Sequence, residues 1–239
     1  MKLLHISDLH LGKKLREFSL IEDQKYILIK IINIIDEEKP DAILIAGDVY
    51  DKGIPPLQAV SLLDDFLTKI WKRKIPCFVI SGNHDSVERL SFCSKLMEEG
   101  KIYVSKSYDG NVTPIELKDE FGPVNIYMLP FISPVEKSFT EAVEQAVQKM
   151  NVDVSKRNVL ISHQLVTGAE RSDSEDLNFG GAEDVAIEVF DCFDYVALGH
   201  IHKPQKCGRE FVRYSVTTLK YSFSEKNKKK SVTIVELKE

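Results

Sequence analysis

Tyr195-Val-Ala-Leu-Gly-His-Ile-His202 is an apolar run that ends in two histidines one residue apart. Side chains alternate along an extended chain, so His200 and His202 are expected to point to the same side at the end of a buried strand. Such a pair would place two metal ligands together. The stretch therefore predicts a metal site at the carboxyl end of this strand.

The same design occurs at four earlier places in the chain. Short apolar runs end in residues that can bind metal: Asp8 and His10 after 3–7, Asp48 after 42–47, Asn83, His84 and Asp85 after 77–82, and His163 after 159–162. In layered α/β folds, ligands bind at the carboxyl ends of the strands. One such residue would be interpreted as a cap, but five of the six histidines lie in these loops. The sixth, His5, is interpreted as a core residue or a support for a ligand.

The composition is that of an ordinary globular chain with a sizeable core, since 43% of the 239 residues are hydrophobic and 29% are charged. The net charge of -5 argues mildly against nucleic acid, although metal ions would reverse the charge of an Asp/His site. The four cysteines show no C-x-x-C spacing, which favours small core residues in a reducing, cytoplasmic environment. No apolar stretch reaches the ~20 residues of a membrane span, so no membrane partner is expected.

The first hundred residues alternate between strand and helix patterns. Strands are expected at 2–7, at 41–46 and after Pro76. Helices are expected from a capping box at Ser19 and Glu22, after Pro56 with Val60 and Trp71 in its apolar stripe, and at about 87–98. This order predicts a parallel sheet with right-handed crossovers.

The second half of the chain has a different pattern. Strand-like runs at about 101–105, 111–117 and 124–129 are typical of a meander, and a helix is expected at about 134–150. After the strand that ends at His163, residues 164–181 are interpreted as a long functional loop. Strands at about 210–216 and 231–237 finish the chain. We expect one domain over residues 1–239, of α/β class, with two sheets packed between helices.

The predicted metal ligands offer only oxygen and imidazole: Asp8, His10, Asp48, Asn83, His163, His200 and His202. This set suits Mn²⁺, Fe²⁺ or Zn²⁺. Seven ligands exceed the need of one ion and fit two ions with Asp48 as the bridge, a centre that activates water for in-line displacement at phosphorus. His84 is then the expected general acid, with Asp85 holding its tautomer. Asp51 is either an orienting residue or a turn cap.

The motifs Asp8-Leu-His10, Gly47-Asp48, Gly82-Asn-His-Asp85, His163 and Gly199-His-Ile-His202 resemble the calcineurin-like metallophosphoesterase superfamily. A narrower set looks like the SbcD exonuclease family, the nuclease subunits of bacterial SbcCD complexes: Thr167-Gly, Ser172-Asp-Ser-Glu175, Gly180-Gly181, residues 195–202 and Leu219-Lys-Tyr-Ser-Phe-Ser-Glu225. The resemblance implies a four-layer αββα sandwich of two mixed sheets. It also implies two divalent ions, with Mn²⁺ preferred over Fe²⁺, Zn²⁺ or Mg²⁺.

The resemblance further implies a function. That function is 3′ to 5′ exonuclease and endonuclease hydrolysis of DNA in double-strand-break repair and recombination. Its implied partners are an SMC-like ATPase of the SbcC type and a second copy of the nuclease domain. One metal would be held by Asp8, His10, Asp48 and His202, and the other by Asp48, Asn83, His163 and His200, with His84 catalytic.

Three departures from the family pattern stand out. Val216-Thr217-Thr218 replaces the usual Gly-Ser-Pro, and Lys52 stands where many superfamily members have Arg. SbcD proteins usually continue into DNA-capping and ATPase-binding segments, which are expected to be absent here. The Lys226–Lys230 run is interpreted as a solvated hairpin turn in preference to a DNA contact.

Two alternatives to the nuclease stay open. One is a phosphatase or cyclic-nucleotide phosphodiesterase on the same scaffold, and the other is a non-catalytic scaffold that binds protein.

Overall fold

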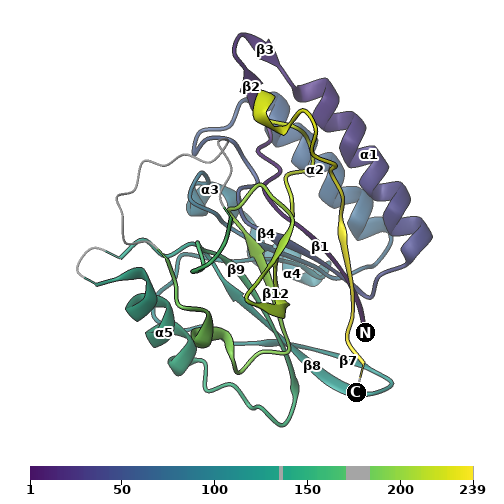
Figure 1. The fold of residues 1–239 in the computed structure, drawn as a ribbon. Helices are drawn as coiled ribbons and strands as arrows, with labels where there is room; N and C mark the ends of the chain where they lie inside the picture. Colours follow the sequence, from purple (N-terminus) through teal and green to yellow (C-terminus); the bar gives the residue numbers. More distant parts are fainter. Residues whose placement is uncertain (135–136, 171–183, 239) are drawn as a thin grey trace.

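Two facing sheets form the centre of the structure, a computed structural model that describes residues 1–134, 137–170 and 184–238 (Figure 1). The first sheet has the strand order β13-β1-β4-β5-β6, and the second has the order β11-β12-β10-β9-β8-β7. Helices cover the two outer faces: α1 and α2 lie on one side of the sheets and α5 on the other. The predicted four-layer αββα sandwich is confirmed.

The first sheet contains β1 (Lys2–Ile6), β4 (Ala42–Ala46), β5 (Cys77–Ile80), β6 (Ile102–Val104) and β13 (Thr233–Glu236). The second contains β7 (Ile115–Asp119), β8 (Gly122–Leu129), β9 (Arg157–His163), β10 (Tyr195–Gly199), β11 (Gln205–Cys207) and β12 (Arg209–Tyr214). A small hairpin joins β2 (Lys14–Leu15) to β3 (Phe18–Ser19). The helices are α1 (Ile21–Glu38), α2 (Leu57–Lys72), α3 (Val87–Leu90), α4 (Ser94–Glu99) and α5 (Phe139–Lys149), with 3-10 turns η1 (Ile187–Phe190) and η2 (Phe223–Glu225).

Three apolar clusters correspond to the three interfaces between the layers. Alternate residues of one strand serve different interfaces, as the pleat requires. In β1, Leu4 packs toward the helices and Leu3 toward the opposite sheet. In β10, Ala197 faces the first sheet and Val196 packs on the α5 side. Central strands such as β4 and β10 are buried on both faces, which explains why they are continuous apolar runs in the sequence.

Several predicted elements differ from the structure. Ser19 lies in β3, and α1 begins after Leu20 without a side-chain cap, so the predicted capping box is wrong. The β2–β3 hairpin includes Ser19, so this residue is not at the N-cap position of α1. Val60 and Trp71 are exposed, because the buried face of α2 follows Ala59, Leu62, Leu63, Phe66, Leu67 and Ile70 instead.

The middle of the chain also differs from the prediction. The helix expected at about 87–98 is two short helices, because Cys93 between them takes a left-handed conformation with φ 61°. The first strand of the expected meander, β6, joins the first sheet in parallel to β5, whereas β7 and β8 pair as an antiparallel hairpin in the second sheet. In the expected loop 164–181, the part from 171 onward lies outside the described residues.

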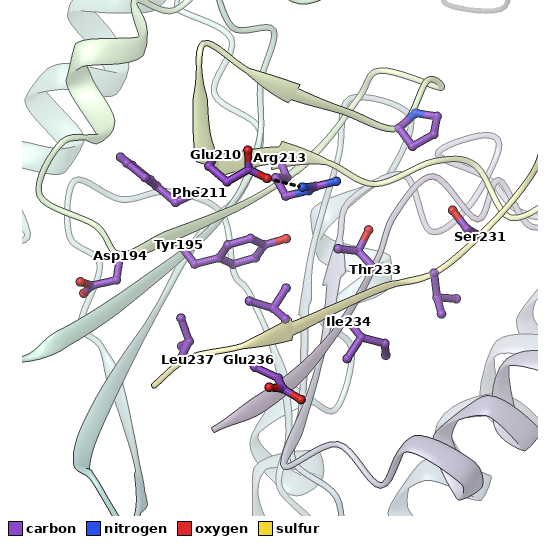
Figure 2. Close-up of a pocket in the computed structure, with 13 residues that line it drawn as sticks. Asp194, Tyr195, Glu210, Phe211, Arg213, Ser231, Thr233, Ile234, Glu236 and Leu237 are labelled. Atoms are coloured by element: carbon purple, nitrogen blue, oxygen red, sulfur yellow. Dashed lines mark hydrogen bonds and ion pairs between the residues drawn. The ribbon is translucent and has the colours of Figure 1, made fainter. Parts of the chain in front are cut away.

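None of the described helices is long and apolar enough to cross a membrane. A pocket of about 560 Å³ lies between β12 and β13, where Arg213 pairs with Glu210 beside Tyr195 (Figure 2). Tyr195 starts β10, whereas His200 and His202 follow its other end. The described lining contains none of the predicted site residues, so the pocket is separate from the metal site.

Candidate metal centre

The carboxyl ends of five strands meet at one edge of the sandwich. Strands β1, β4 and β5 are parallel in the first sheet, and β9 and β10 are parallel in the second. The loops that follow β1, β4, β5 and β10, and the last residue of β9, carry the seven predicted ligands: Asp8, His10, Asp48, Asn83, His163, His200 and His202. The structure brings all seven together, although the chain spreads them over nearly two hundred residues.

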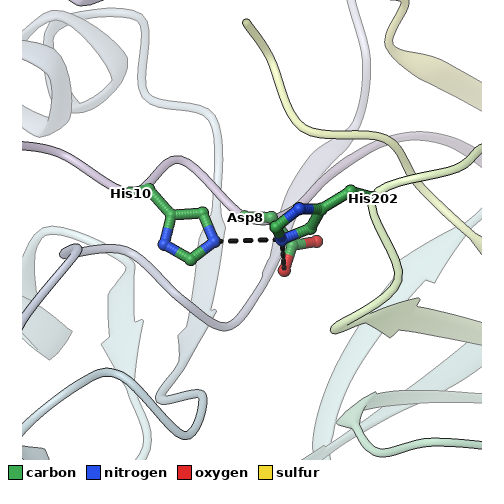
Figure 3. A group of neighbouring side chains, drawn as sticks. All are labelled: Asp8, His10 and His202. Atoms are coloured by element: carbon green, nitrogen blue, oxygen red, sulfur yellow. Dashed lines mark hydrogen bonds and ion pairs between the residues drawn. The ribbon is translucent and has the colours of Figure 1, made fainter. Parts of the chain in front are cut away.

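Asp8, His10 and His202 form one group of this site (Figure 3). Nε2 of His10 lies 3.1 Å from Nε2 of His202, and Nε2 of His202 lies 3.9 Å from a carboxylate oxygen of Asp8. All three side chains are buried. Ligand atoms of three residues therefore converge from loops of both sheets.

Asn83, His163 and His200 form a second group. The side-chain oxygen of Asn83 lies 3.1 Å from Nε2 of His163 and 3.0 Å from Nδ1 of His200. The His163 and His200 rings meet edge to face, with centroids 5.2 Å apart. This group again joins the two sheets, since Asn83 follows β5 and the histidines belong to β9 and the end of β10.

Asp48 lies between the two groups. Its Oδ2 atom is 3.7 Å from Nε2 of His10 and 3.5 Å from Nε2 of His163, and it is 3.9 Å from Nε2 of His84. One carboxylate oxygen thus faces ligands of both groups. This placement is what a carboxylate shared by two ions requires.

His200 and His202 do not act as a pair on one face of a strand. The strand β10 ends at Gly199, and His200 has φ 98°, outside the extended region. His200 contacts Asn83, whereas His202 contacts His10. The expectation from strand alternation is therefore wrong, although both imidazoles reach the same site.

Four of the predicted ligands have an unfavourable backbone conformation. Asp8, His10, Asp48 and His200 all have positive φ, at 52°, 43°, 48° and 98°. Such conformations cost of the order of 1–3 kcal/mol each in residues other than glycine, and they cluster at functional sites. Gly199 permits the close approach of the loops, because a Cβ there would collide with the Ala46 carbonyl and the His163 ring.

The tautomer of His163 fits metal binding. Its Nδ1 lies 2.8 Å from the carbonyl oxygen of Ala46 and must donate to it, so Nε2 is the ring nitrogen that faces the site. Metal-binding histidines commonly donate their other N–H to a carbonyl in this way. Nε2 lies 3.1 Å from the side-chain oxygen of Asn83, and both atoms can bind a cation. The donors present therefore fit a divalent ion.

The charges of the two buried carboxylates depend on their surroundings. Burial raises the pKa of Asp8 to about 7, and the charge of Asp48 adds to this effect. Burial also acts on Asp48, but the imidazoles around it, first that of His163, outweigh this and hold its pKa well below the ordinary value. The site favours positive charge among its ligands, as a cation centre does.

Asp85 does not take the place beside His84 that the sequence predicted. Nδ1 of His84 lies 3.0 Å from the carbonyl oxygen of Asp51 and donates to it, which turns Nε2 toward Asp48. The Asp85 carboxylate instead accepts the backbone N–H groups of Val49, Tyr50 and Gly82. The expectation that Asp85 holds the His84 tautomer is corrected: the Asp51 carbonyl orients the ring, and Asp85 joins two loops.

Asp51 and His5 each have two interpretations from the sequence alone. The Asp51 carboxylate lies 3.6 Å from Nδ1 of His10 and 2.7 Å from Nζ of Lys13, which favours the orienting role. Its pKa falls to about 2, because the contacts with His10 and Lys13 outweigh the effect of burial. His5 is a core residue whose Nδ1 lies 2.9 Å from the hydroxyl of Tyr195.

Sequence reasoning missed two residues around the site. Gln24 of α1 is fully buried and donates to the carbonyl oxygen of His10 at 2.7 Å. Gln24 lies on the same face of α1 as Leu28 and continues its apolar stripe. A polar residue in such a stripe is the sequence feature that could have identified it. Phe131 stacks near the His200 ring with centroids 6.4 Å apart, and nothing in its sequence context marks it.

A calcineurin-like phosphoesterase family model matches residues 1–204, a range that contains every predicted ligand and His84. The chain belongs to this family. Two of the narrower predicted motifs, at Ser172–Glu175 and Gly180–Gly181, lie outside the described residues.

Two curated relatives of the chain are each named as the SbcD component of the nuclease SbcCD. The protein from Staphylococcus epidermidis is 38% identical over 251 aligned positions, and that from Staphylococcus saprophyticus is 38% identical over 252. The alignments cover 99% and 100% of this chain and 66% of each relative, so the chain spans just under two thirds of their length. The predicted resemblance to SbcD is confirmed as sequence similarity.

A solved structure supports the fold alone. A dimetal phosphatase from Danio rerio superposes with a TM-score of 0.55 at 13% identity, covering 91% of this chain and 88% of its own. The likeness therefore extends over nearly all of the sandwich.

Proposed function

We propose that this chain is the catalytic part of a DNA nuclease of the SbcD type, which hydrolyses phosphodiester bonds with two divalent metal ions. The observation that carries the proposal is the convergence of seven ligand residues and His84 at one edge of the sandwich. The similarity to two curated SbcD proteins favours a nuclease over a phosphatase.

The proposed ligand sets follow the two groups of side chains. Asp8, His10 and His202 would hold one ion, Asn83, His163 and His200 the other, with Asp48 shared. When bound, two such ions supply Lewis acidity toward the phosphoryl oxygen and the attacking water. We propose Mn²⁺ in preference to Fe²⁺, Zn²⁺ or Mg²⁺, since oxygen and imidazole donors without thiolate suit it.

His84 would hold the proton that the leaving oxygen needs. Its Nδ1–H is occupied by the Asp51 carbonyl, so the proton for transfer is carried on Nε2, which faces the site. The backbone N–H of His84 donates to Oδ1 of Asp48 at 3.0 Å and keeps the His84 loop against the bridging carboxylate. The backbone N–H of His200 likewise donates to the Asp8 carboxylate at 3.0 Å and orients it.

The experiment that tests this function is cleavage of end-labelled single-stranded and duplex DNA by the purified chain with Mn²⁺, Mg²⁺ or chelator. The expected result is Mn²⁺-dependent, chelator-sensitive cutting that His84→Ala abolishes. Single-stranded DNA should be the better substrate, and degradation of duplex DNA should be weak. A small phosphodiester and a phosphomonoester are assayed in parallel. Fast phosphomonoester turnover without DNA cleavage would favour a phosphatase, and no turnover of any substrate would favour a scaffold.

The partners of the proposed nuclease are DNA and an ATPase of the SbcC type. The support is the printed name of the relatives, which makes each of them one component of an SbcCD nuclease. A role in double-strand-break repair, in the cytoplasm, belongs to the same proposal. Co-purification of the chain with an SbcC-type ATPase, and ATP-dependent stimulation of duplex cleavage, would test it.

We also propose a homodimer, formed through the surface between α2 and α4. Trp71, Phe92 and Leu96 are exposed there, at 53%, 76% and 74%, and they line a groove of about 700 Å³. Exposed apolar patches of this kind mark protein interfaces. A Leu96→Glu variant should sediment as a monomer at concentrations where the wild type is a dimer. Val154→Glu, which alters an equally exposed residue at 75%, is the matched control and should stay dimeric.

A further inference from the structure

The segment after β12 crosses back over the loop that carries Asp8 and His10. We define residues 217–230 as the strap. Tyr221 in the strap is buried, and its hydroxyl donates to the carbonyl oxygen of Leu9 across 212 positions of sequence. The Tyr221 ring also meets the His10 ring edge to face, with centroids 5.6 Å apart. The strap therefore contacts the backbone and the side chain of a predicted ligand loop.

Gln24 extends this contact from the other side of the loop. Its amide nitrogen lies 3.1 Å from the Tyr221 hydroxyl and 2.7 Å from the His10 carbonyl oxygen. Its side-chain oxygen accepts the backbone N–H of Gly12 at 2.9 Å. The loop from Leu9 to Gly12 is thus held between a helix and the strap. His10 needs such support, because its φ of 43° is unfavourable by itself.

Buried charges hold the strap in place. The fully buried Glu225 accepts the backbone N–H of Tyr221 at 2.7 Å and pairs with Nζ of Lys230 at 3.1 Å. Lys230 also donates to the hydroxyl of Thr217, so the two ends of the strap are joined. Only 11% of the Lys230 side chain is exposed, and the interpretation of this lysine as part of a solvated turn is wrong. Thr217, one of the departures from the family pattern, is its partner.

The other half of the centre is held by different contacts. His163 belongs to β9 and is oriented by the Ala46 carbonyl. The loop of Asn83 is held by Asp85, which accepts the Gly82 N–H at 2.9 Å. These contacts come from the sheet ends and not from the strap. The strap contacts described above therefore lie on the His10 side of the centre, whereas His163 and the Asn83 loop are held by the sheet ends.

We infer that Tyr221 and Glu225 are positioning residues for one metal ion only, the ion on the side of Asp8, His10 and His202. This inference rests on the proposed two-metal centre and adds an asymmetry between its ions. Residues that orient metal ligands typically change metal affinity by about 10- to 100-fold when they are removed. Tyr221→Phe should lower the affinity for one of the two ions by that factor and leave the affinity for the other unchanged.

The test is a titration of the metal-free protein with Mn²⁺, in which the unbound ion is followed by electron paramagnetic resonance. Tyr221→Phe and Glu225→Gln should each retain one ion at wild-type affinity and bind the second more weakly. Tyr195→Phe is the matched control, because it also removes a buried hydroxyl contact but at the opposite end of β10. It should bind both ions as the wild type does.

A second set of variants identifies the affected ion. In an Asn83→Ala background, where the remaining ion is on the His10 side, Tyr221→Phe should weaken the remaining binding. In a His202→Ala background it should have no effect. Equal weakening of both ions, unchanged binding of both, or the same selective loss in Tyr195→Phe would contradict the inference. A wild-type protein that binds fewer than two ions would instead contradict the proposed centre itself.

Discussion

At the scale of single residues, the neighbours His84 and Asp85 have different tasks. Asp85 gathers three backbone N–H groups from the loops after β4 and β5, at 3.1, 2.8 and 2.9 Å. Nε2 of His84 faces the Asp48 carboxylate at 3.9 Å. One position therefore holds two loops together, and the adjacent position carries the proposed proton transfer.

Asp85→Asn should lower the free energy of unfolding by about 2 kcal/mol. The amide replaces an acceptor oxygen with an N–H donor in a buried place where backbone donors need acceptors. Urea unfolding monitored by fluorescence measures the change. His84→Ala is the comparison and should destabilise the protein less than Asp85→Asn, because the partly exposed His84 ring donates to the Asp51 carbonyl whereas the Asp85 carboxylate accepts three backbone N–H groups. Similar stability of Asp85→Asn and wild type would contradict the joining role.

His5 makes a prediction about pH. Burial lowers its pKa to about 3, whereas the unfolded chain has a histidine pKa near 6.5. Above about pH 6.5, His5 is neutral in both the folded and the unfolded protein, so its protonation does not affect stability. As pH falls from about 6.5 toward about 3, only the unfolded state takes up the proton, so stability falls by up to about 1.4 kcal/mol for each pH unit.

The measurement is urea unfolding at several pH values for the wild type and His5→Gln. The difference between the two proteins isolates His5 from the other histidines. The wild type should lose more stability than His5→Gln between pH 6.5 and 4. Parallel losses would show that His5 is protonated in the folded state as easily as in the unfolded one.

At the scale of elements, helices α1 and α5 start in different ways. Ser138 accepts the Glu141 N–H at 3.2 Å, and Glu141 accepts the Ser138 N–H at 3.0 Å, so α5 has a complete capping box. Helix α1 carries the same residue types at Ser19 and Glu22 but no side-chain cap, because Ser19 belongs to the preceding hairpin.

Ser138→Ala should therefore destabilise the protein by about 1 kcal/mol, the usual cost of a lost N-cap. Ser19→Ala is the matched control and should change the stability by less than about 0.5 kcal/mol, as expected of a surface substitution. Denaturant unfolding of the two variants gives the comparison. Equal effects would mean that the helix starts do not differ in solution.

At the scale of the whole molecule, the site joins the two halves of the sandwich. Asp8, His10, Asp48 and Asn83 come from the first sheet, whereas His163, His200 and His202 come from the second. Bound ions would connect loops of both sheets, in addition to the apolar cluster that lies between them. Metal binding and global stability are therefore expected to be linked.

Mn²⁺ at about 100 times its dissociation constant should stabilise the protein by about 2.7 kcal/mol for each ion. For a chain of this size, the thermal midpoint then rises by roughly 5–10 °C per ion. Differential scanning calorimetry with Mn²⁺ and with chelator measures the shift. Asp48→Asn should show almost none of it, because the shared carboxylate is lost. A midpoint that does not respond to Mn²⁺ in the wild type would contradict the proposed centre.

The sequence alone determined the layered fold and identified the candidate residues of the site. Continuous apolar runs mark strands buried on both faces, and parallel strands bring their carboxyl ends to one edge. Candidate ligands after such runs therefore share an edge within each sheet, whereas the packing of the two sheets decides that the two edges coincide. The repeated pattern was sufficient to name the candidate ligands Asp8, His10, Asp48, Asn83 and the last three histidines.

Only the tertiary structure decided how these residues are divided and supported. His200 and His202 contact different groups, because the chain leaves the extended conformation after Gly199. The Asp51 carbonyl, and not Asp85, orients His84. The contacts of Tyr221 with Leu9 and of Glu225 with Lys230 depend on how a distant segment folds over the site. Local pattern encodes which residues reach the edge of the sheets, whereas hydrogen bonds between distant segments set their orientation.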